Sequence, residues 1–263
     1  MGAAAVAAPA APDGSSELRQ GLQQGVLIAA ALLALALPPA SPPRFIARTA
    51  TPAVPVSVAP PARVSVARHL DFGSEKPSAA ARRLAEWVVA AADNGNRPFA
   101  IVDKHDARAF LFEPGGRLII GTAVLLGYAH GDDSVPGIGM RPIALVRPSE
   151  RTTPAGRFLA QPGHNTLGND VVWVDYENAV SMHRVRPTDP RERRLERLAT
   201  PSPRDNRISY GCINVPGNVF DRHFWPVFGA GPSVIYVMPE AKPLAAVFPA
   251  LAAPPVPGTV ARL

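Results

Sequence analysis

Short apolar or alternating runs, separated by clusters of Gly, Pro, Asn and Asp, follow one another along the chain from residue 99 onward. Runs of this length between turn-forming residues predict β-strands. They do not alternate with helical segments, so the pattern predicts a mostly β fold with a few short helices around a mostly antiparallel, sandwich- or barrel-like core. The predicted strands cover residues 99–103, 108–113, 117–126, 142–146, 171–176, 179–183 and 233–238.

Three further stretches have the features of helices. In the first, apolar residues recur at three- and four-residue spacing from Leu84 to Ala91, and Ser78 is placed to cap the N-terminus. The second begins at Asp189, which is followed by a first-turn proline, and the third runs from about residue 218 to residue 228.

A continuous apolar run, VLIAAALLALAL, occupies residues 26–37 and is followed by PPASPP. It is shorter than the ~20 residues that span a bilayer and matches the ~7 to 15 of a signal-peptide core. We therefore expect residues 1–40 to be an export signal, with an uncleaved membrane anchor that tethers the chain to the inner membrane as the alternative. Both readings place the protein in the periplasm or cell envelope.

The proline-rich segments predict where the folded domain begins and ends. Proline accounts for 31 of the 263 residues, more than twice the usual share of roughly 5%. Residues 41–76 are rich in Pro, Ala and Val without helical periodicity, which predicts an extended tether. Residues 77–240 are the predicted folded domain, and residues 241–263 are predicted to be a loose Pro-rich tail.

The composition of the chain excludes several kinds of site and partner. Hydrophobic residues make up 47% of the chain and charged residues 18%, enough for one core of ordinary size. The net charge is +6, but no segment interleaves basic and aromatic residues, so we do not expect nucleic-acid binding. Cys212 is the only cysteine, which excludes an intramolecular disulfide and any zinc site with two cysteine ligands.

Cys212 lies in the segment RISYGCINVP, directly after a Ser-Tyr-Gly turn. Gly211 lets the backbone approach a substrate closely, and the amides of Gly211 and Cys212 are candidates for stabilising an oxyanion. Two readings remain open, a small buried hydrophobe or a nucleophile. Export favours the nucleophile, because an unpaired thiol in an oxidising compartment is a liability unless it is used.

A nucleophilic cysteine needs a base. His183 ends the apolar run 179–183, so a strand can hold its imidazole beside the segment that carries Cys212. The other histidines lie at the end of the tether, in polar turns or beside aromatic residues of a predicted helix; they are His69, His105, His130, His164 and His223.

The segment SYGCIN at 209–214, with His183 upstream, resembles the Ser/Thr-His-Gly-Cys-x-Asn/Arg signature of the L,D-transpeptidase catalytic domain, the YkuD-like fold. RTTPAGRF at 151–158 is similar to the Thr-Pro-x-Gly-x-Phe segment that precedes the catalytic histidine in that family. Three motifs therefore occur in the family's order. The resemblance implies a β-sandwich-like fold, which agrees with the predicted strands.

The resemblance also implies an activity: cysteine-dependent acyl transfer on peptidoglycan stem peptides, without a metal or cofactor. Cys212 would be the nucleophile and His183 the base, the backbone carbonyl of Arg184 would orient the imidazole, and Gly211 would supply an oxyanion donor. The other residues that match motif positions in the cleft are Ser209, Tyr210, Asn214 and Thr153.

Two features depart from the family pattern. Tyr210 stands where the family has a histidine, and the interval between His183 and Cys212 is longer than usual. The added length corresponds to PRERRLERLA, whose arginines we interpret as a solvated helical face. Two alternatives therefore remain: a tethered cell-wall-binding protein whose chemistry has lapsed, and an L,D-carboxypeptidase-like hydrolase in which water resolves the acyl-enzyme.

Overall fold

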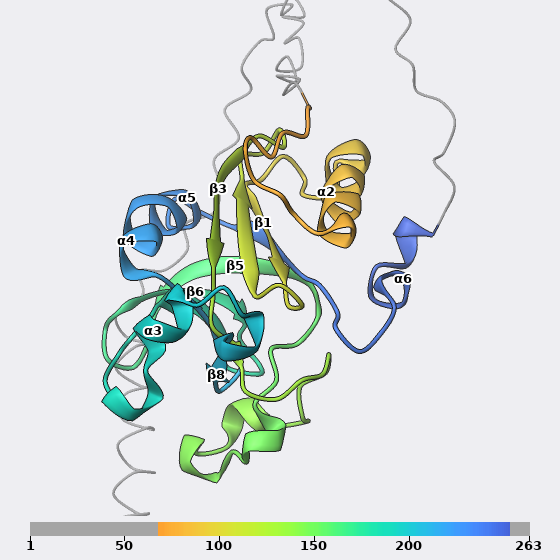
Figure 1. The fold of residues 1–263 in the computed structure, drawn as a ribbon. Coiled ribbons are helices and arrows are strands. Elements are labelled where there is room, and N and C mark those ends of the chain that lie inside the picture. The colour runs from red at the N-terminus through yellow and green to blue at the C-terminus, as the bar shows by residue number, and fades with distance from the viewer. Residues whose placement is uncertain (1–67, 253–263) are drawn as a thin grey trace, which may run out of the picture. The chain divides into compact units, whose positions relative to one another are not determined.

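The computed structural model describes residues 68–252, all of which belong to one compact unit (Figure 1). Residues 1–67 and 253–263 lie outside the described residues, and with them the predicted export segment and most of the predicted tether. Within residues 68–252 no helix is both long enough and apolar enough to cross a membrane.

The fold is mostly β, with a nearly closed sheet and few short helices, which confirms the predicted fold class. Eight strands form one sheet in the order β3-β2-β1-β10-β5-β6-β7-β9, and β4 and β8 form a second. In the large sheet the pairs β1–β10 and β7–β9 are parallel and the others antiparallel. The strands are β1 (Phe99–Asp103), β2 (Arg108–Phe112), β3 (Leu118–Ala123), β4 (Leu126–Gly127), β5 (Gly156–His164), β6 (Asp170–Asp175), β7 (Val180–Arg184), β8 (Arg207–Ser209), β9 (Ile213–Val215) and β10 (Ser233–Val237).

The helical segments are short apart from the first. They are α2 (Ala79–Ala91), α3 (Arg194–Ala199), α4 (Gly217–Val219), α5 (Trp225–Phe228), α6 (Leu244–Val247), the 3₁₀ turns η1 (Ile138–Met140), η2 (Ile143–Leu145), η3 (Pro148–Glu150), η4 (Pro190–Glu192), η5 (Pro203–Asn206) and η7 (Pro249–Leu251), and the π-helical turn η6 (Phe220–Phe224).

The centre of the large sheet is buried on both faces, which explains why its strands are continuous apolar runs. All five residues of β1 are buried. Because successive side chains point to opposite faces, Phe99 and Ile101 pack in the cluster under α2, whereas Ala100 and Val102 face the cluster that contains the aromatic residues of η6 and α5. Figure 1 shows α2 on one side of the sheet and α4 and α5 on the other.

The three predicted helical segments begin close to the predicted residues. The Ser78 side chain accepts a hydrogen bond from the amide of Ala81, and so caps α2. Asp189 accepts from the amide of Arg191, but the segment first forms the 3₁₀ turn η4 and only then α3. The predicted third helix is the run of α4, η6 and α5.

One predicted strand is wrong, and one long strand was not predicted. The predicted strand 142–146 contains the 3₁₀ turn η2 (Ile143–Leu145) instead, and Ile143 and Leu145 are each 64% exposed. Prolines flank this run and lack the N–H that a sheet ladder needs, so an apolar run alone does not make a strand here. Conversely, the nine-residue β5 was not predicted, because Pro162 interrupts its sequence pattern. It pairs with both β10 and β6.

The folded unit is longer at both ends than residues 77–240. Phe72, in the predicted tether, is 3% exposed, and its ring packs edge-on against Phe110 and Phe112. Phe248, in the predicted loose tail, is 4% exposed and packs against Tyr236. The prediction of a loose tail is therefore wrong for residues 241–252, because their apolar side chains cover the edge of the α2 cluster.

Candidate active site

The parallel pairing of β7 with β9 brings the predicted nucleophile and base together. In this pairing His183 stands opposite Asn214, and Met182 stands opposite Ile213. Cys212 directly precedes β9 and therefore lies beside Ser181, which is two positions before His183 on β7 and shares its face. Both side chains line an open cleft of about 370 Å³. All six histidines lie in the described residues, and His183 is the one that lines this cleft.

The Cys212 thiol is half-buried, with Ser181 Oγ and the carbonyl oxygen of Ala179 each 3.7 Å from Sγ. Burial raises the pKa of this thiol, but the hydrogen bond and charge of His183, together with Ser181, outweigh burial and lower the pKa below its ordinary value. A lowered pKa increases the thiolate fraction at neutral pH, and the thiolate is the nucleophilic form.

The tautomer of His183 follows from its neighbours. Nδ1 lies 2.8 Å from the carbonyl oxygen of Arg184, which can only accept a hydrogen bond, so Nδ1 carries the proton. In the neutral ring Nε2 is then an acceptor, and Asn214 Nδ2 lies 3.2 Å from it as a donor. This tautomer leaves His183 able to take a proton at Nε2.

The turn before Cys212 is closed by Ser209. Its hydroxyl accepts from the amide of Gly211 at 3.1 Å and donates to the carbonyl of Cys212 at 2.6 Å. Gly211 has φ +124°, and a Cβ atom there would lie 2.8 Å from the Thr152 carbonyl oxygen, so the position requires glycine. Because the Gly211 amide is already bonded to Ser209, it is not a free oxyanion donor in this structure.

Thr153 links this turn to the neighbouring segment. Its buried hydroxyl donates to the carbonyl of Gly211 at 2.8 Å and accepts from the amide of Gly127 at 2.8 Å. The Thr-Pro motif segment therefore braces the turn that presents Cys212.

Tyr210, the departure from the family pattern, contacts an arginine. The Arg151 guanidinium lies 3.7 Å from the centroid of the Tyr210 ring, which is a cation–π contact. The same guanidinium donates to the carbonyl of Val146 through Nε at 3.3 Å and Nη2 at 3.2 Å. Tyr210 thus connects the Cys212 turn to the segment that contains Ile143, one of the residues that line the cleft.

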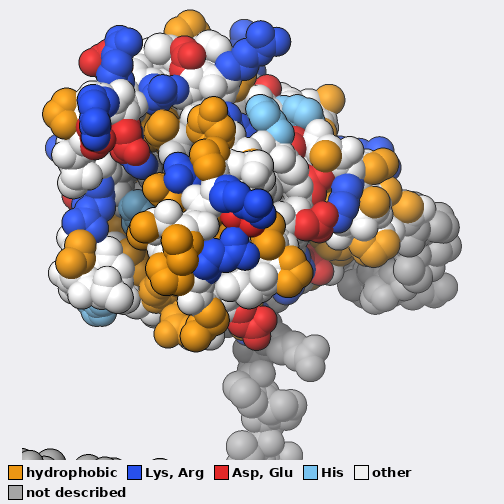
Figure 2. Space-filling model, turned by 90° about the horizontal axis from the view of Figure 1, so that it is seen from below, with side chains coloured by type: hydrophobic (Ala, Val, Ile, Leu, Met, Phe, Trp, Pro, Cys, Tyr) orange, Lys and Arg blue, Asp and Glu red, His pale blue; other side chains and the backbone are white. Residues whose placement is uncertain are grey.

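This segment carries several exposed apolar side chains. Met140 is 89% exposed, and Ile143 and Leu145 are both more than half exposed. The segment lies at the bottom of Figure 1, and the view from below in Figure 2 shows apolar side chains interspersed with Lys and Arg on that face. Leu167, 70% exposed, also lines the cleft, so the cleft wall is partly apolar.

Sequence reasoning missed two contacts of the site. Ser181 lies two residues before His183 on one strand, and this spacing, which puts both side chains on the same face, was a readable signal. Arg194 carried no such signal, and its interpretation as a solvated arginine is wrong. Its side chain is only 12% exposed and donates to Asn214 Oδ1.

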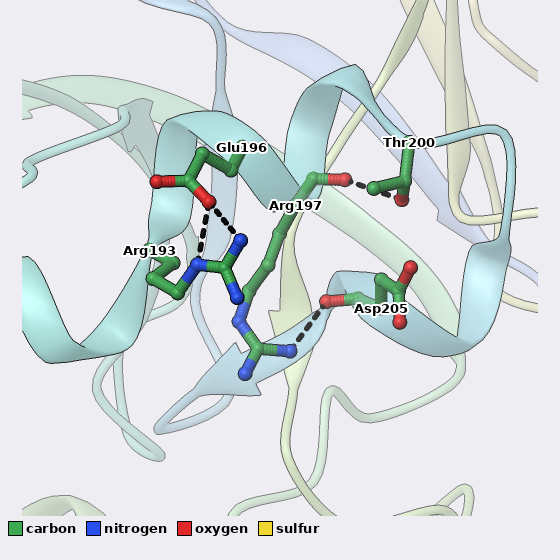
Figure 3. A pocket seen from close by; sticks show the side chains of 5 residues that line it. All are labelled: Arg193, Glu196, Arg197, Thr200 and Asp205. Atoms are coloured by element: carbon green, nitrogen blue, oxygen red, sulfur yellow. Dashed lines mark hydrogen bonds and ion pairs between the residues drawn. The ribbon is translucent and has the colours of Figure 1, made fainter.

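A second pocket, of about 180 Å³, lies beside α3 and is drawn in Figure 3. There Arg193 pairs with Glu196, and Arg197 donates to the backbone oxygen of Asp205. It contains neither Cys212 nor His183. In the described part of the chain, no group of three or more His, Cys, Asp or Glu side chains is placed to hold a metal ion.

Comparison with known proteins identifies no family from sequence: no family model matches the chain, and no curated protein matches it. Solved structures do match. LdtMt1, an L,D-transpeptidase in complex with imipenem, shares 15% identity at a TM-score of 0.34, over 54% of this chain and 58% of that one. An L,D-transpeptidase from Mycobacterium smegmatis shares 14% identity at a TM-score of 0.34, over 54% and 58%.

The helical cell shape determining protein Pgp2 from Campylobacter jejuni also matches, with 13% identity and a TM-score of 0.37 over 61% of this chain and 57% of that one. The match spans less than two thirds of each of these three chains. Matches at this identity and TM-score establish nothing about activity, for which the contacts of Cys212 and His183 are the relevant observations. L,D-transpeptidases are thus among the solved structures similar to this chain, and theirs is the family that the motif at 209–214 resembles.

Proposed function

We propose that this protein is an exported, cysteine-dependent acyl transferase of the L,D-transpeptidase type that acts on peptidoglycan stem peptides. The observation that carries the proposal is the arrangement of Cys212 and His183. A thiol with a lowered pKa shares an open cleft with an imidazole whose Nδ1 proton is held by a backbone carbonyl. This is the pairing of nucleophile and oriented base that acyl transfer requires.

In the proposed reaction, His183 Nε2 takes the thiol proton while Cys212 Sγ attacks an amide carbonyl of the stem peptide. A C–S bond forms, and the carbonyl oxygen becomes an oxyanion. The C–N bond then breaks as His183 returns the proton to the departing D-alanine amine, which leaves a thioester. An acceptor amine attacks the thioester and forms a C–N bond while His183 takes its proton; the C–S bond then breaks, and His183 returns the proton to the sulfur to regenerate the thiol.

The surrounding residues support this sequence. The Arg184 carbonyl, 2.8 Å from Nδ1, stabilises the imidazolium that forms. We assign the oxyanion to the amide of Cys212, since the amide of Gly211 donates to Ser209. Gly211 acts instead by allowing the turn to approach Thr152 closely.

The test is intact-mass spectrometry of the full chain after incubation with imipenem, the compound present in the LdtMt1 structure. We expect one covalent adduct on the parent, none on Cys212→Ala, and much slower formation on His183→Ala. His105→Ala, which alters an exposed turn histidine outside the cleft, is the matched control and should react like the parent.

A stem tetrapeptide then separates the outcomes of the acyl-enzyme. Cross-linked product with an added acceptor amine supports transpeptidation, and hydrolysis to the tripeptide alone supports the carboxypeptidase-like alternative. If Cys212 reacts with neither imipenem nor the tetrapeptide, the proposal is overturned, and a wall-binding protein without catalytic activity is favoured.

A further inference from the structure

Arg194 connects α3 to the candidate active site. It lies between His183 and Cys212 in the sequence, and its guanidinium lines the same cleft. Its Nε donates to Glu192 Oε2 at 2.6 Å and its Nη1 donates to Asn214 Oδ1, with the side chain only 12% exposed. Glu192 thus holds the Arg194 guanidinium in place, and the guanidinium in turn donates to the side-chain oxygen of Asn214.

The chain of hydrogen bonds from Arg194 through Asn214 to His183 has one chemically permitted direction at each step. Arginine has donors only, so the Asn214 oxygen must face Arg194 and the Asn214 NH₂ group must face the imidazole. An NH₂ group can only donate, so Nε2 of His183 accepts. The ring proton is then on Nδ1, where the Arg184 carbonyl accepts it.

We infer that Arg194 is a positioning residue: by fixing the amide of Asn214, it orients His183 with Nε2 as the hydrogen-bond acceptor. The inference rests on the proposed function, in which Nε2 takes the Cys212 proton. Without Arg194 the Asn214 amide is free to turn, and its oxygen can accept a hydrogen bond from a protonated Nε2. The imidazolium would then have an acceptor at each nitrogen, so the ring would stay protonated to higher pH.

Charge must be separated from this positioning effect. The charged and titratable groups around the ring are Cys212, Tyr210 and Arg186 in the cleft, the Arg194–Glu192 pair, and Arg184 with its partners Asp170 and Asp221. Loss of Arg194 also removes a positive charge, which by itself favours protonation. Arg186→Met removes an equal charge from the same cleft without touching Asn214, and is the matched control.

The experiment is an NMR titration of the His183 ring in the parent, Arg194→Met, Arg186→Met, Asn214→Leu and the Arg194→Met/Asn214→Leu double variant. We expect Arg194→Met to raise the titration midpoint by about one pH unit, more than Arg186→Met does. When Asn214 is already leucine, Arg194→Met should shift the His183 midpoint only as much as the loss of one positive charge does. Equal shifts in both backgrounds, or equal shifts for the two arginines, would overturn the inference.

Arg194→Lys keeps a donor and a charge, so it should keep the parent midpoint; if Arg194→Met fails to fold, Asn214→Leu, which removes the amide that Arg194 fixes, is compared with the parent and Arg194→Lys instead. Imipenem acylation is measured on the same samples. A reactive parent whose His183 midpoint does not depend on Arg194 contradicts only the positioning role. An unreactive parent contradicts the proposed function, and the titration still reports on Arg194.

Discussion

The hydroxyl of Thr153 donates a 2.8 Å hydrogen bond to the carbonyl of Gly211, 58 positions further along the chain. The same hydroxyl accepts from the amide of Gly127, so one buried side chain joins three backbone segments next to Cys212. The geometry of the cysteine turn therefore depends on a residue far away in sequence.

Removal of this hydroxyl should weaken both the fold and the site. In Thr153→Val the shape is kept, but a buried carbonyl and a buried amide lose their partner, which costs about 1–3 kcal/mol. We expect the free energy of unfolding in urea to fall by that amount and imipenem acylation to slow. Thr153→Ser keeps the hydroxyl and is the control, and a Thr153→Val variant as stable as the parent would contradict the bracing role.

Gly211→Ala should be more damaging to the site than an alanine elsewhere. The backbone has φ +124° and the new Cβ would lie 2.8 Å from the Thr152 oxygen, so strain of about 1–3 kcal/mol is expected, with loss of acylation. Gly217, where a Cβ meets nothing within 4 Å, provides the control. Urea unfolding and adduct formation are measured for both, and equal behaviour of the two variants would contradict this account.

Tyr210 should hold the cleft wall. In Tyr210→Leu the Arg151 guanidinium loses its aromatic face, a contact worth about 0.5–2 kcal/mol, and its hold on the Val146 carbonyl weakens. We expect faster amide hydrogen exchange in residues 143–146, with the Tyr210→Phe variant close to the parent. Unchanged exchange in Tyr210→Leu would show that the stacking does not hold this segment.

The buried pair of Lys104 and Asp132 should set part of the acid sensitivity. Lys104 Nζ lies 2.8 Å from Asp132 Oδ1 and 3.0 Å from the carbonyl of Thr153. Burial raises the pKa of Asp132, but Lys104 and the amides of Glu240 and Lys242 outweigh it and lower the pKa to about 2. A carboxyl whose pKa is depressed in the fold stabilises it above the unfolded value of about 3.9.

This contribution should be lost as the pH falls from about 4 towards 2. Urea unfolding across that range should therefore show a steeper loss of stability in the parent than in Asp132→Asn. That variant should also be less stable at neutral pH, by less than the about 3–5 kcal/mol that a wholly unpaired buried charge costs, because Lys104 loses its nearer carboxylate and keeps only Glu240, 3.5 Å away. Asp133→Asn, at a 72% exposed neighbour, is the control. The same slope for parent and Asp132→Asn would refute the assignment.

The sequence was informative where one local feature decides the structure. Ser78 caps α2, and the apolar run that ends at His183 forms β7. The hydrophobic pattern gave the wrong element where contacts with distant segments decide whether a strand forms. The run at 142–146 pairs with no strand among residues 68–252, and β5 is a strand despite Pro162 because two neighbours pair with it.

The candidate site shows the same division. Cys212 and His183 stand out by residue type and position, whereas the contacts that orient them join distant segments. Arg194 looked like any other arginine in PRERRLERLA, and only the packing of α3 shows that it bonds Asn214. Likewise, the partner of Tyr210 is Arg151, which no spacing rule pairs with it.

In the proposed function, His183 activates Cys212. Since Cys212 is the only cysteine, the rate of iodoacetamide alkylation as a function of pH reports this thiol alone. We predict a midpoint below the ~8.5 of a free cysteine, a higher midpoint in His183→Ala, and no change in His105→Ala. A parent midpoint equal to or above that of the same chain unfolded in guanidinium chloride would contradict the account.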